Sequence, residues 1–66
     1  MELSSMDKKI LSQWVIQYRP DNVSQPWSIL DSFDNKLSAI IKAYQVSGMY
    51  FMVKVIDPSG SLIWSD

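Results

Sequence analysis

The chain has 66 residues, a net charge of −1 and no cysteine or histidine. Without these two residue types there is no disulfide, thiol nucleophile, imidazole base or zinc site of the usual kind. With seven acidic and six basic residues, the chain also lacks the basic excess typical of nucleic-acid binders and the acidity of a DNA mimic. A domain of this size buries only about 60% of its unfolded surface, so it must rely on a dense apolar core, on oligomerisation or on a partner.

The chain is expected to form one domain with a short arm. Residues 1–9 lack a periodic apolar pattern and predict a flexible N-terminal arm, and residues 10–66 predict a single small α+β domain. No run approaches the ~18 apolar residues of a transmembrane helix. Lys8 and Lys9 are not followed by the apolar segment of a signal peptide. We therefore expect a cytoplasmic protein.

The first predicted strand covers residues 10–19 and stops before Pro20. It is rich in β-forming residues, and Trp14, Ile16 and Tyr18 recur at every second position. We expect this aromatic face to point toward the core and the intervening glutamines to point outward.

A loop and a second strand are predicted next. Residues 20–26 hold two prolines, an Asp-Asn pair and a serine, which are typical of a loop. Apolar side chains alternate less regularly in residues 27–33, and Pro26 stands at the start of this run, where its missing N–H is harmless. We expect this strand to pair antiparallel with the first.

Residues 34–46 predict a helix. Asp34 is placed to cap its free N–H groups and Phe33 to pack on its first turns, while Gly48 is a natural terminator. Apolar residues at i, i+3, i+4 and i+7 form one stripe, which we expect to face the sheet. Its members are Leu37, Ile40, Ile41 and Tyr44, flanked by Ala39 and Ala43.

The C-terminal stretch predicts a β-hairpin. Residues 50–56 are aromatic and β-branched, residues 57–60 favour a turn, and a second apolar run ends at Trp64. The predicted fold is α+β: a single four-stranded antiparallel sheet with one helix packed on one face, in the order β-β-α-β-β.

One helix of about three turns covers only one face of such a sheet, yet both faces of the strand at residues 50–56 are apolar. An uncovered apolar face is a candidate contact surface; the alternative is that the sheet curls and residues 1–9 fold across it. Aromatic residues and methionine are enriched in the cores of interfaces. The predicted partner-binding residues are Tyr50, Met52, Ile56 and Trp64, with Tyr18 and Arg19 at the rim.

No pattern predicts catalysis. The serines lie in no nucleophile motif, and without histidine or cysteine only Lys, Asp or Glu could activate them. Asp31 and Asp34 are three residues apart, but a turn residue and a helix cap explain them better than an acid–base pair. We expect no enzymatic activity, no cofactor and no metal.

Three stretches, residues 27–34, 37–44 and 52–64, together resemble many short proteins of bacteriophages and prophages. In those proteins a short helix precedes a hairpin with an Asp-x-x-Gly turn and a second strand ending in Trp. The resemblance covers residues 12–65 and implies a phage or mobile-element accessory protein. Some members of this loose class are anti-CRISPR proteins or other host-takeover inhibitors, which occlude a site on a larger bacterial complex. The class shares no catalytic residues.

The sequence therefore predicts a non-enzymatic protein-binding module, for which the resemblance implies a phage-encoded inhibitor of a bacterial complex in the host cytoplasm. Two alternatives use the same sheet face. In the first, the face closes a homodimer. In the second, its aromatic residues stack on a single-stranded nucleic acid, with phosphates held by Arg19, Lys54 and the pair Lys8 and Lys9. So few basic residues disfavour nucleic acid as the partner, and no membrane contact is predicted.

Overall fold

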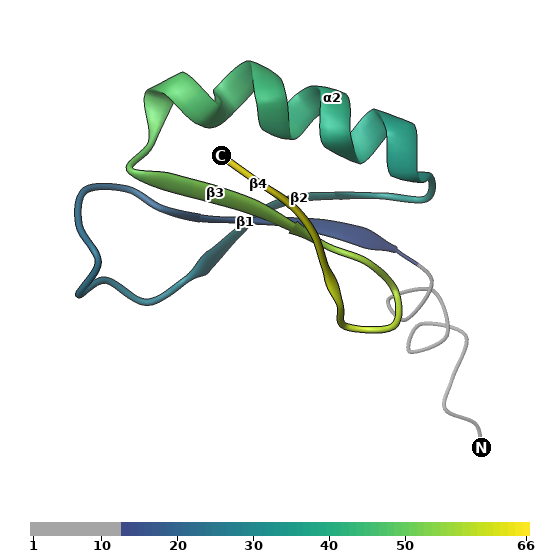
Figure 1. The fold of residues 1–66 in the computed structure, drawn as a ribbon, viewed down its shortest axis with the longest axis horizontal. Coiled ribbons are helices and arrows are strands. Elements are labelled where there is room, and N and C mark those ends of the chain that lie inside the picture. The colour runs from purple at the N-terminus through teal and green to yellow at the C-terminus, as the bar shows by residue number, and fades with distance from the viewer. Residues whose placement is uncertain (1–12) are drawn as a thin grey trace.

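The computed structural model describes residues 13–66, so the predicted arm at residues 1–9 and the predicted start of the first strand lie outside the described residues. The elements are β1 (Trp14–Arg19), β2 (Ser28–Phe33), α2 (Lys36–Val46), the 3₁₀ turn η1 (Ser47–Met49), β3 (Met52–Ile56) and β4 (Leu62–Ser65). Figure 1 shows α2 lying along one side of the strands. The predicted α+β fold, a four-stranded antiparallel sheet with one helix in the order β-β-α-β-β, is confirmed.

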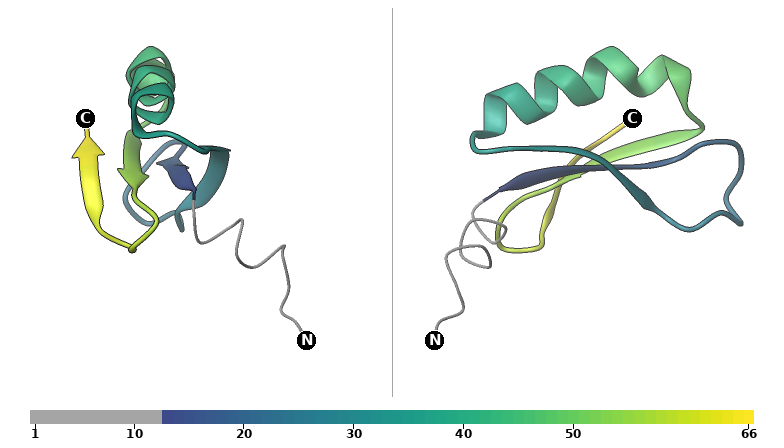
Figure 2. Two further views of the ribbon diagram at one scale, coloured as in Figure 1. Left: turned by 90° about the vertical axis from the view of Figure 1, so that its right-hand side faces the viewer. Right: turned by 180° about the vertical axis from the view of Figure 1, so that it is seen from behind.

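The strands do not lie in sequence order: the sheet runs β2-β1-β3-β4. β1 and β3 form the centre and pair antiparallel, with Ile16 opposite Val55 and Tyr18 opposite Val53. β2 and β4 are the edges, and each pairs with the central strand next to it in the chain. The helix connects the β2 edge to central strand β3 and lies over the middle of the sheet (Figure 2).

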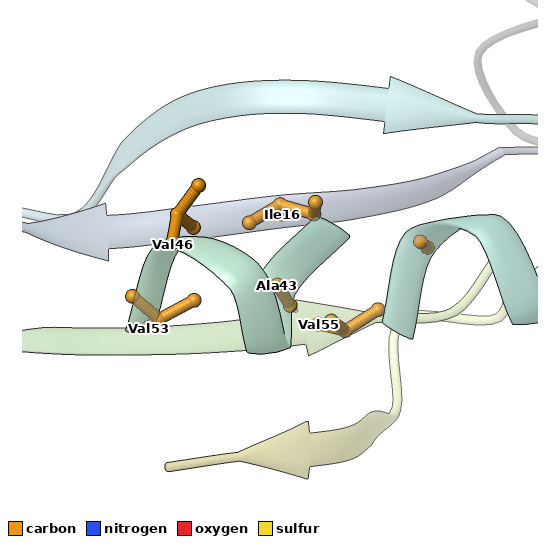
Figure 3. Packing of buried hydrophobic residues seen from close by; sticks show 6 residues of the cluster. Ile16, Ala43, Val46, Val53 and Val55 are labelled. Carbon is orange, nitrogen blue, oxygen red and sulfur yellow. The ribbon is translucent and has the colours of Figure 1, made fainter. Parts of the chain in front are cut away.

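The core lies between α2 and the two central strands (Figure 3). Its buried members are Ile16, Val53 and Val55 from the strands and Ala39, Ala43 and Val46 from the helix. Trp14 and Tyr18 share the face of β1 with Ile16 and pack, partly buried, against this cluster. The predicted inward face of the first strand is therefore confirmed. Branched side chains from the sheet supply most of the volume, and the helix supplies mainly methyl groups.

The helix stripe predicted to face the sheet points outward instead. The exposed fractions are 68% for Leu37, 48% for Ile41 and 73% for Tyr44, and only Ile40 of the predicted stripe is half-buried. At 3.6 residues per turn, the three exposed positions lie nearly opposite the two buried alanines. The strands already place β-branched and aromatic side chains under the helix, so its face of small residues is the one that can approach closely.

Both ends of the helix also differ from the prediction. The N-cap is Asn35, not Asp34, and Oδ1 of Asn35 accepts a hydrogen bond from the Ser38 N–H at 2.8 Å. Asn and Asp cap about equally well, so their order in the sequence could not decide between these neighbours. Gly48 lies in η1, and within residues 13–66 only Gly60 is a glycine with positive φ.

The turn between β3 and β4 forms as predicted. The Asp57 N–H donates to the Ser61 carbonyl and the Gly60 N–H to the Asp57 carbonyl, both at 2.9 Å, and Gly60 takes a φ of 91°. Oδ1 of Asp57 accepts bonds from the Ser59 hydroxyl at 2.7 Å and from the N–H groups of Ser59 and Ser61 at 3.0 and 2.9 Å. These bonds, above all the one from the Ser59 hydroxyl, hold the pKa of Asp57 below its ordinary value.

The orientation of the helix predicts that a substitution at Ala43 changes the stability of the fold strongly and that one at the nearby Ile41 hardly changes it. Ala43→Leu adds volume to a filled core and should destabilise the fold by about 1–3 kcal/mol. Ile41→Ala removes an exposed side chain and should change stability by less than about 0.5 kcal/mol, whereas a core isoleucine would cost about 2–5 kcal/mol. Urea unfolding of both variants checks this. A large loss in Ile41→Ala with little effect of Ala43→Leu would contradict the observed packing.

The Asp57 turn predicts a pH-dependent contribution to stability. Because folding lowers the pKa of Asp57, the contribution is present above the unfolded-state pKa and is lost as the pH falls through the lowered, folded-state pKa. An Asp57→Asn variant cannot titrate, so it should be less stable than the wild type at neutral pH, and the difference should shrink in acid. Urea midpoints at several pH values measure this difference. If the difference in stability between the wild type and Asp57→Asn stays constant with pH, ionisation of Asp57 does not stabilise the turn.

Candidate functional site

The second face of the sheet carries no helix within residues 13–66 (Figure 2). Strand alternation and register place on it the side chains that do not point toward α2. We call this surface the open sheet face; its residues are Val15, Gln17, Arg19, Ile29, Met52, Lys54, Ile56 and Leu62. Ile29 is 69% and Leu62 58% exposed, so apolar groups meet solvent at both edges of this face.

The loop between β1 and β2 places Trp27 at this face. Oε1 of Gln25 accepts hydrogen bonds from the N–H groups of Asp21 and Asn22 at 2.6 and 3.1 Å. The Gln25 N–H in turn donates to the Asn22 carbonyl at 3.2 Å. These bonds fold the loop back on itself, so that the chain returns to the sheet through Pro26 and the Trp27 ring meets side chains of both central strands.

Two cations lie against the Trp27 ring. Cζ of Arg19 is 4.6 Å from the ring centroid and Nζ of Lys54 is 4.0 Å from it, within the range of cation–π attraction. Nη1 of Arg19 also contacts Sδ of Met52 at 3.8 Å. We call these four residues the cation–aromatic cluster. It brings β1 and the loop that follows it together with β3, which is far from both in the sequence.

The Arg19 guanidinium is not fully satisfied within the described residues. Its Nε is buried and has no hydrogen-bond partner there, and its one described hydrogen bond goes to the weak sulfur acceptor of Met52. A buried donor without a partner costs free energy, so such a group calls for an explanation. No acceptor for this donor lies within residues 13–66.

The described carboxylates with hydrogen bonds bind backbone groups or neighbouring side chains. Asp57 holds the hairpin turn, Oδ1 of Asp31 accepts from the Ser32 N–H at 2.8 Å, and Oδ1 of Asp66 accepts from the Val53 N–H at 3.1 Å. Within residues 13–66, none of them makes a hydrogen bond to Arg19. The charge of the cation–aromatic cluster is thus left available to a group from outside this range.

The predicted partner-binding residues are divided between two environments. Arg19, Met52 and Ile56 lie on the open sheet face. The other three, Tyr18, Tyr50 and Trp64, pack against the core cluster. The rings of Tyr18 and Tyr50 have centroids 4.5 Å apart and planes inclined by 45°. Tyr50 precedes β3, so the alternation that sets the faces of β3 does not extend to it.

Sequence reasoning missed Trp27 as a member of this surface and considered Lys54 only as a phosphate contact. The sequence contained one signal for Trp27: it is two positions from Ile29, and side chains at that spacing in an extended chain point to the same side. Ile29 lies opposite Gln17 on the open sheet face. The contact of Trp27 with both cations depends on the loop hydrogen bonds and on the β1–β3 pairing, which no local pattern indicates.

A second exposed apolar surface lies on the other side of the molecule. It is formed by Leu37, Ile41 and Tyr44, and we call it the outward helix stripe. Lys36 and Lys42 belong to the same helix, and α2 contains no acidic residue. The molecule therefore presents apolar side chains on both outer layers, with basic residues beside each.

Residues 13–66 contain no group of three or more His, Cys, Asp or Glu side chains that could hold a metal ion. Among the helices of that range, none is long and apolar enough to cross a membrane. Comparison of the chain with protein-family models, curated proteins and solved structures finds no match.

The cation–aromatic cluster predicts an energetic coupling that can be measured. Lys54→Met should destabilise the fold by about 0.5–1 kcal/mol through loss of the contact with Trp27. The same substitution should cost nearly nothing in a Trp27→Leu background. A double-mutant cycle of unfolding free energies isolates the interaction free energy between Lys54 and Trp27. Lys36→Met is the control for loss of a surface charge. Equal costs in both backgrounds would mean that Lys54 and Trp27 do not interact.

Proposed function

We propose that the protein is a binding module for another protein and acts without catalysis. The observation that carries the proposal is the outward helix stripe: three large apolar side chains stand on the face of α2 that the fold does not use, with exposed fractions of 48–73%. Contiguous exposed apolar surface is rare in a monomeric protein and marks sites of contact. Burying such a stripe in a partner also adds to the stability of a small domain.

The spacing of the stripe suggests how a partner would be contacted. Leu37, Ile41 and Tyr44 are at positions i, i+4 and i+7, which is the pattern of a helix that lies in an apolar groove of its partner. The opposite face of α2 is fixed on the sheet through Ala39 and Ala43. The helix is thus held in place before binding, and less conformational entropy is lost on association than for a peptide that must fold.

Charge favours a foreign partner over a second copy of the chain. α2 carries Lys36 and Lys42 but no carboxylate, so a contact between the helices of two copies would contain no acidic side chain of either helix to offset these lysines. A partner with an apolar groove and an acidic border would complement the helix instead. Occlusion of a site on a bacterial complex in the cytoplasm is the form of this function implied by the sequence resemblance, and it stays a prediction.

The proposal predicts that one exposed tyrosine matters for binding and not for folding. After photo-cross-linking from position 44 identifies a partner in cells, the purified partner should bind Tyr44→Ala with a loss of more than about 1 kcal/mol, roughly fivefold or more in affinity. The neighbouring exposed residue Gln45 supplies the control, because Gln45→Ala should bind as the wild type does. Circular dichroism and urea unfolding should show an unchanged fold for both variants.

Two results would contradict the proposal. If Tyr44→Ala, Ile41→Ala and Gln45→Ala all bind the partner as tightly as the wild type, the stripe is not the contact. If the cross-links from position 44 join only copies of this chain, the stripe closes a homo-oligomer and the charge argument fails.

A further inference from the structure

The chemistry of the open sheet face differs from that of the outward helix stripe, because two cations gather there around one aromatic ring. The guanidinium of Arg19 lies between the Trp27 ring and Met52, and its Nε is buried without a partner among the described residues. Lys54 adds a second cation at 4.0 Å from the same ring centroid. We propose that this cluster binds a carboxylate of a foreign protein, presented by a segment in which the acidic residue is flanked by apolar side chains.

The donors suit a carboxylate. A guanidinium offers several N–H groups in one plane and can bind both oxygens of a carboxylate at once, while an ammonium adds a point charge beside it. Stacking against Trp27 and contact with Met52 reduce the freedom of the Arg19 side chain, so its donors are partly oriented before the ligand arrives.

The surroundings require that the ligand also has apolar groups. Ile29, 69% exposed, and Leu62, 58% exposed, lie on opposite sides of the cluster, because β2 and β4 are the two edges of the sheet. Ile56 lies opposite Leu62 on the same face. A small hydrated anion would leave these side chains in water, whereas a peptide segment lying across the strands would cover them and exclude water from the charge pair.

Charge also disfavours a second copy as the occupant of this face. A two-fold contact through the open sheet face pairs the patch with itself, so both copies would bring Arg19 and Lys54 to one contact. Within residues 13–66, no carboxylate makes a hydrogen bond to Arg19. Charge complementarity therefore favours a foreign segment that carries its own negative group.

A single-stranded nucleic acid fits this face less well. Its affinity rests on several phosphate contacts, but the other described basic residues, Lys36 and Lys42, lie on the helix above the opposite face. The Trp27 ring is also in contact with both cations of the cluster, which leaves less of its surface for base stacking. Two cations around one aromatic ring match one carboxylate better than a row of phosphates.

The test uses the full-length chain and a pair of blocked tetrapeptides that differ in one atom group: acetyl-leucyl-glutamyl-isoleucyl-leucine amide and the same peptide with glutamine in place of glutamate. Binding is followed by the chemical shift of the Trp27 indole N–H in nuclear magnetic resonance titrations. We expect the glutamate peptide to bind about tenfold more tightly than the glutamine peptide, as for one charge-assisted hydrogen bond. Arg19→Gln should abolish this preference, and Lys36→Gln should leave it unchanged.

Other variants and probes keep the test decisive. If Arg19→Gln does not fold, Lys54→Gln should still reduce the preference of the chain for the glutamate peptide. Equal affinity for the two peptides, or tighter binding of a ten-nucleotide oligothymidine than of the glutamate peptide, would overturn the proposal. So would a large gain in peptide affinity in the Glu2→Gln, Asp7→Asn variant, because a carboxylate of the chain itself would then be the ligand.

This inference rests on the proposed protein-binding function but concerns a different face. The two can fail separately. Loss of the glutamate preference in Arg19→Gln with full retention in Tyr44→Ala would support the carboxylate site whatever the helix binds. Loss of partner affinity in Tyr44→Ala together with equal affinity for both peptides would leave the helix contact intact and remove only the carboxylate site.

Discussion

The close approach of α2 to the two central strands decides the rest of the structure. Ala39 and Ala43 carry only methyl groups, so the helix can lie directly on Ile16, Val53 and Val55, all of which are completely buried. This packing gives a domain without disulfides a continuous dry layer. It also has a consequence for the surface, because Leu37, Ile41 and Tyr44 of the same helix are left on the opposite face, in contact with solvent.

The order of the strands has a comparable effect on the other layer. Because β1 and β3 are neighbours in the centre, Arg19 and Lys54 come close enough to contact one aromatic ring. The loop folded around Gln25 delivers that ring from outside the sheet. Both candidate surfaces are thus by-products of how the core forms. The outward helix stripe consists of side chains of α2 that stay outside the core when its small residues are buried. The open sheet face consists of strand side chains that point away from α2.

Local patterns predicted the elements and the inward face of β1, but not the orientation of the helix. Period-two alternation in β1 and the Asp57–Gly60 turn have local causes, and both were predicted correctly. The helix was harder, since it has two candidate faces: large apolar residues at 37, 41 and 44, and small ones at 39 and 43. Hydrophobicity favours the first face, but the space left by the strand side chains, which is a property of the whole fold, favours the second. For the same reason the cluster around Trp27 could not be predicted, as it depends on strand order.

The central claim is that α2 packs through its alanines, and proton–proton distances in solution test it most directly. A nuclear Overhauser spectrum of the methyl-labelled full-length chain should show strong cross-peaks from the Ala39 and Ala43 methyls to those of Val53, Val55 and Ile16. The methyls of Leu37 and Ile41 should show none to these strand residues. Strong cross-peaks from Leu37 and Ile41 to the strand valines, with the alanine methyls silent, would show that the helix is turned the other way and would remove the basis for the outward helix stripe.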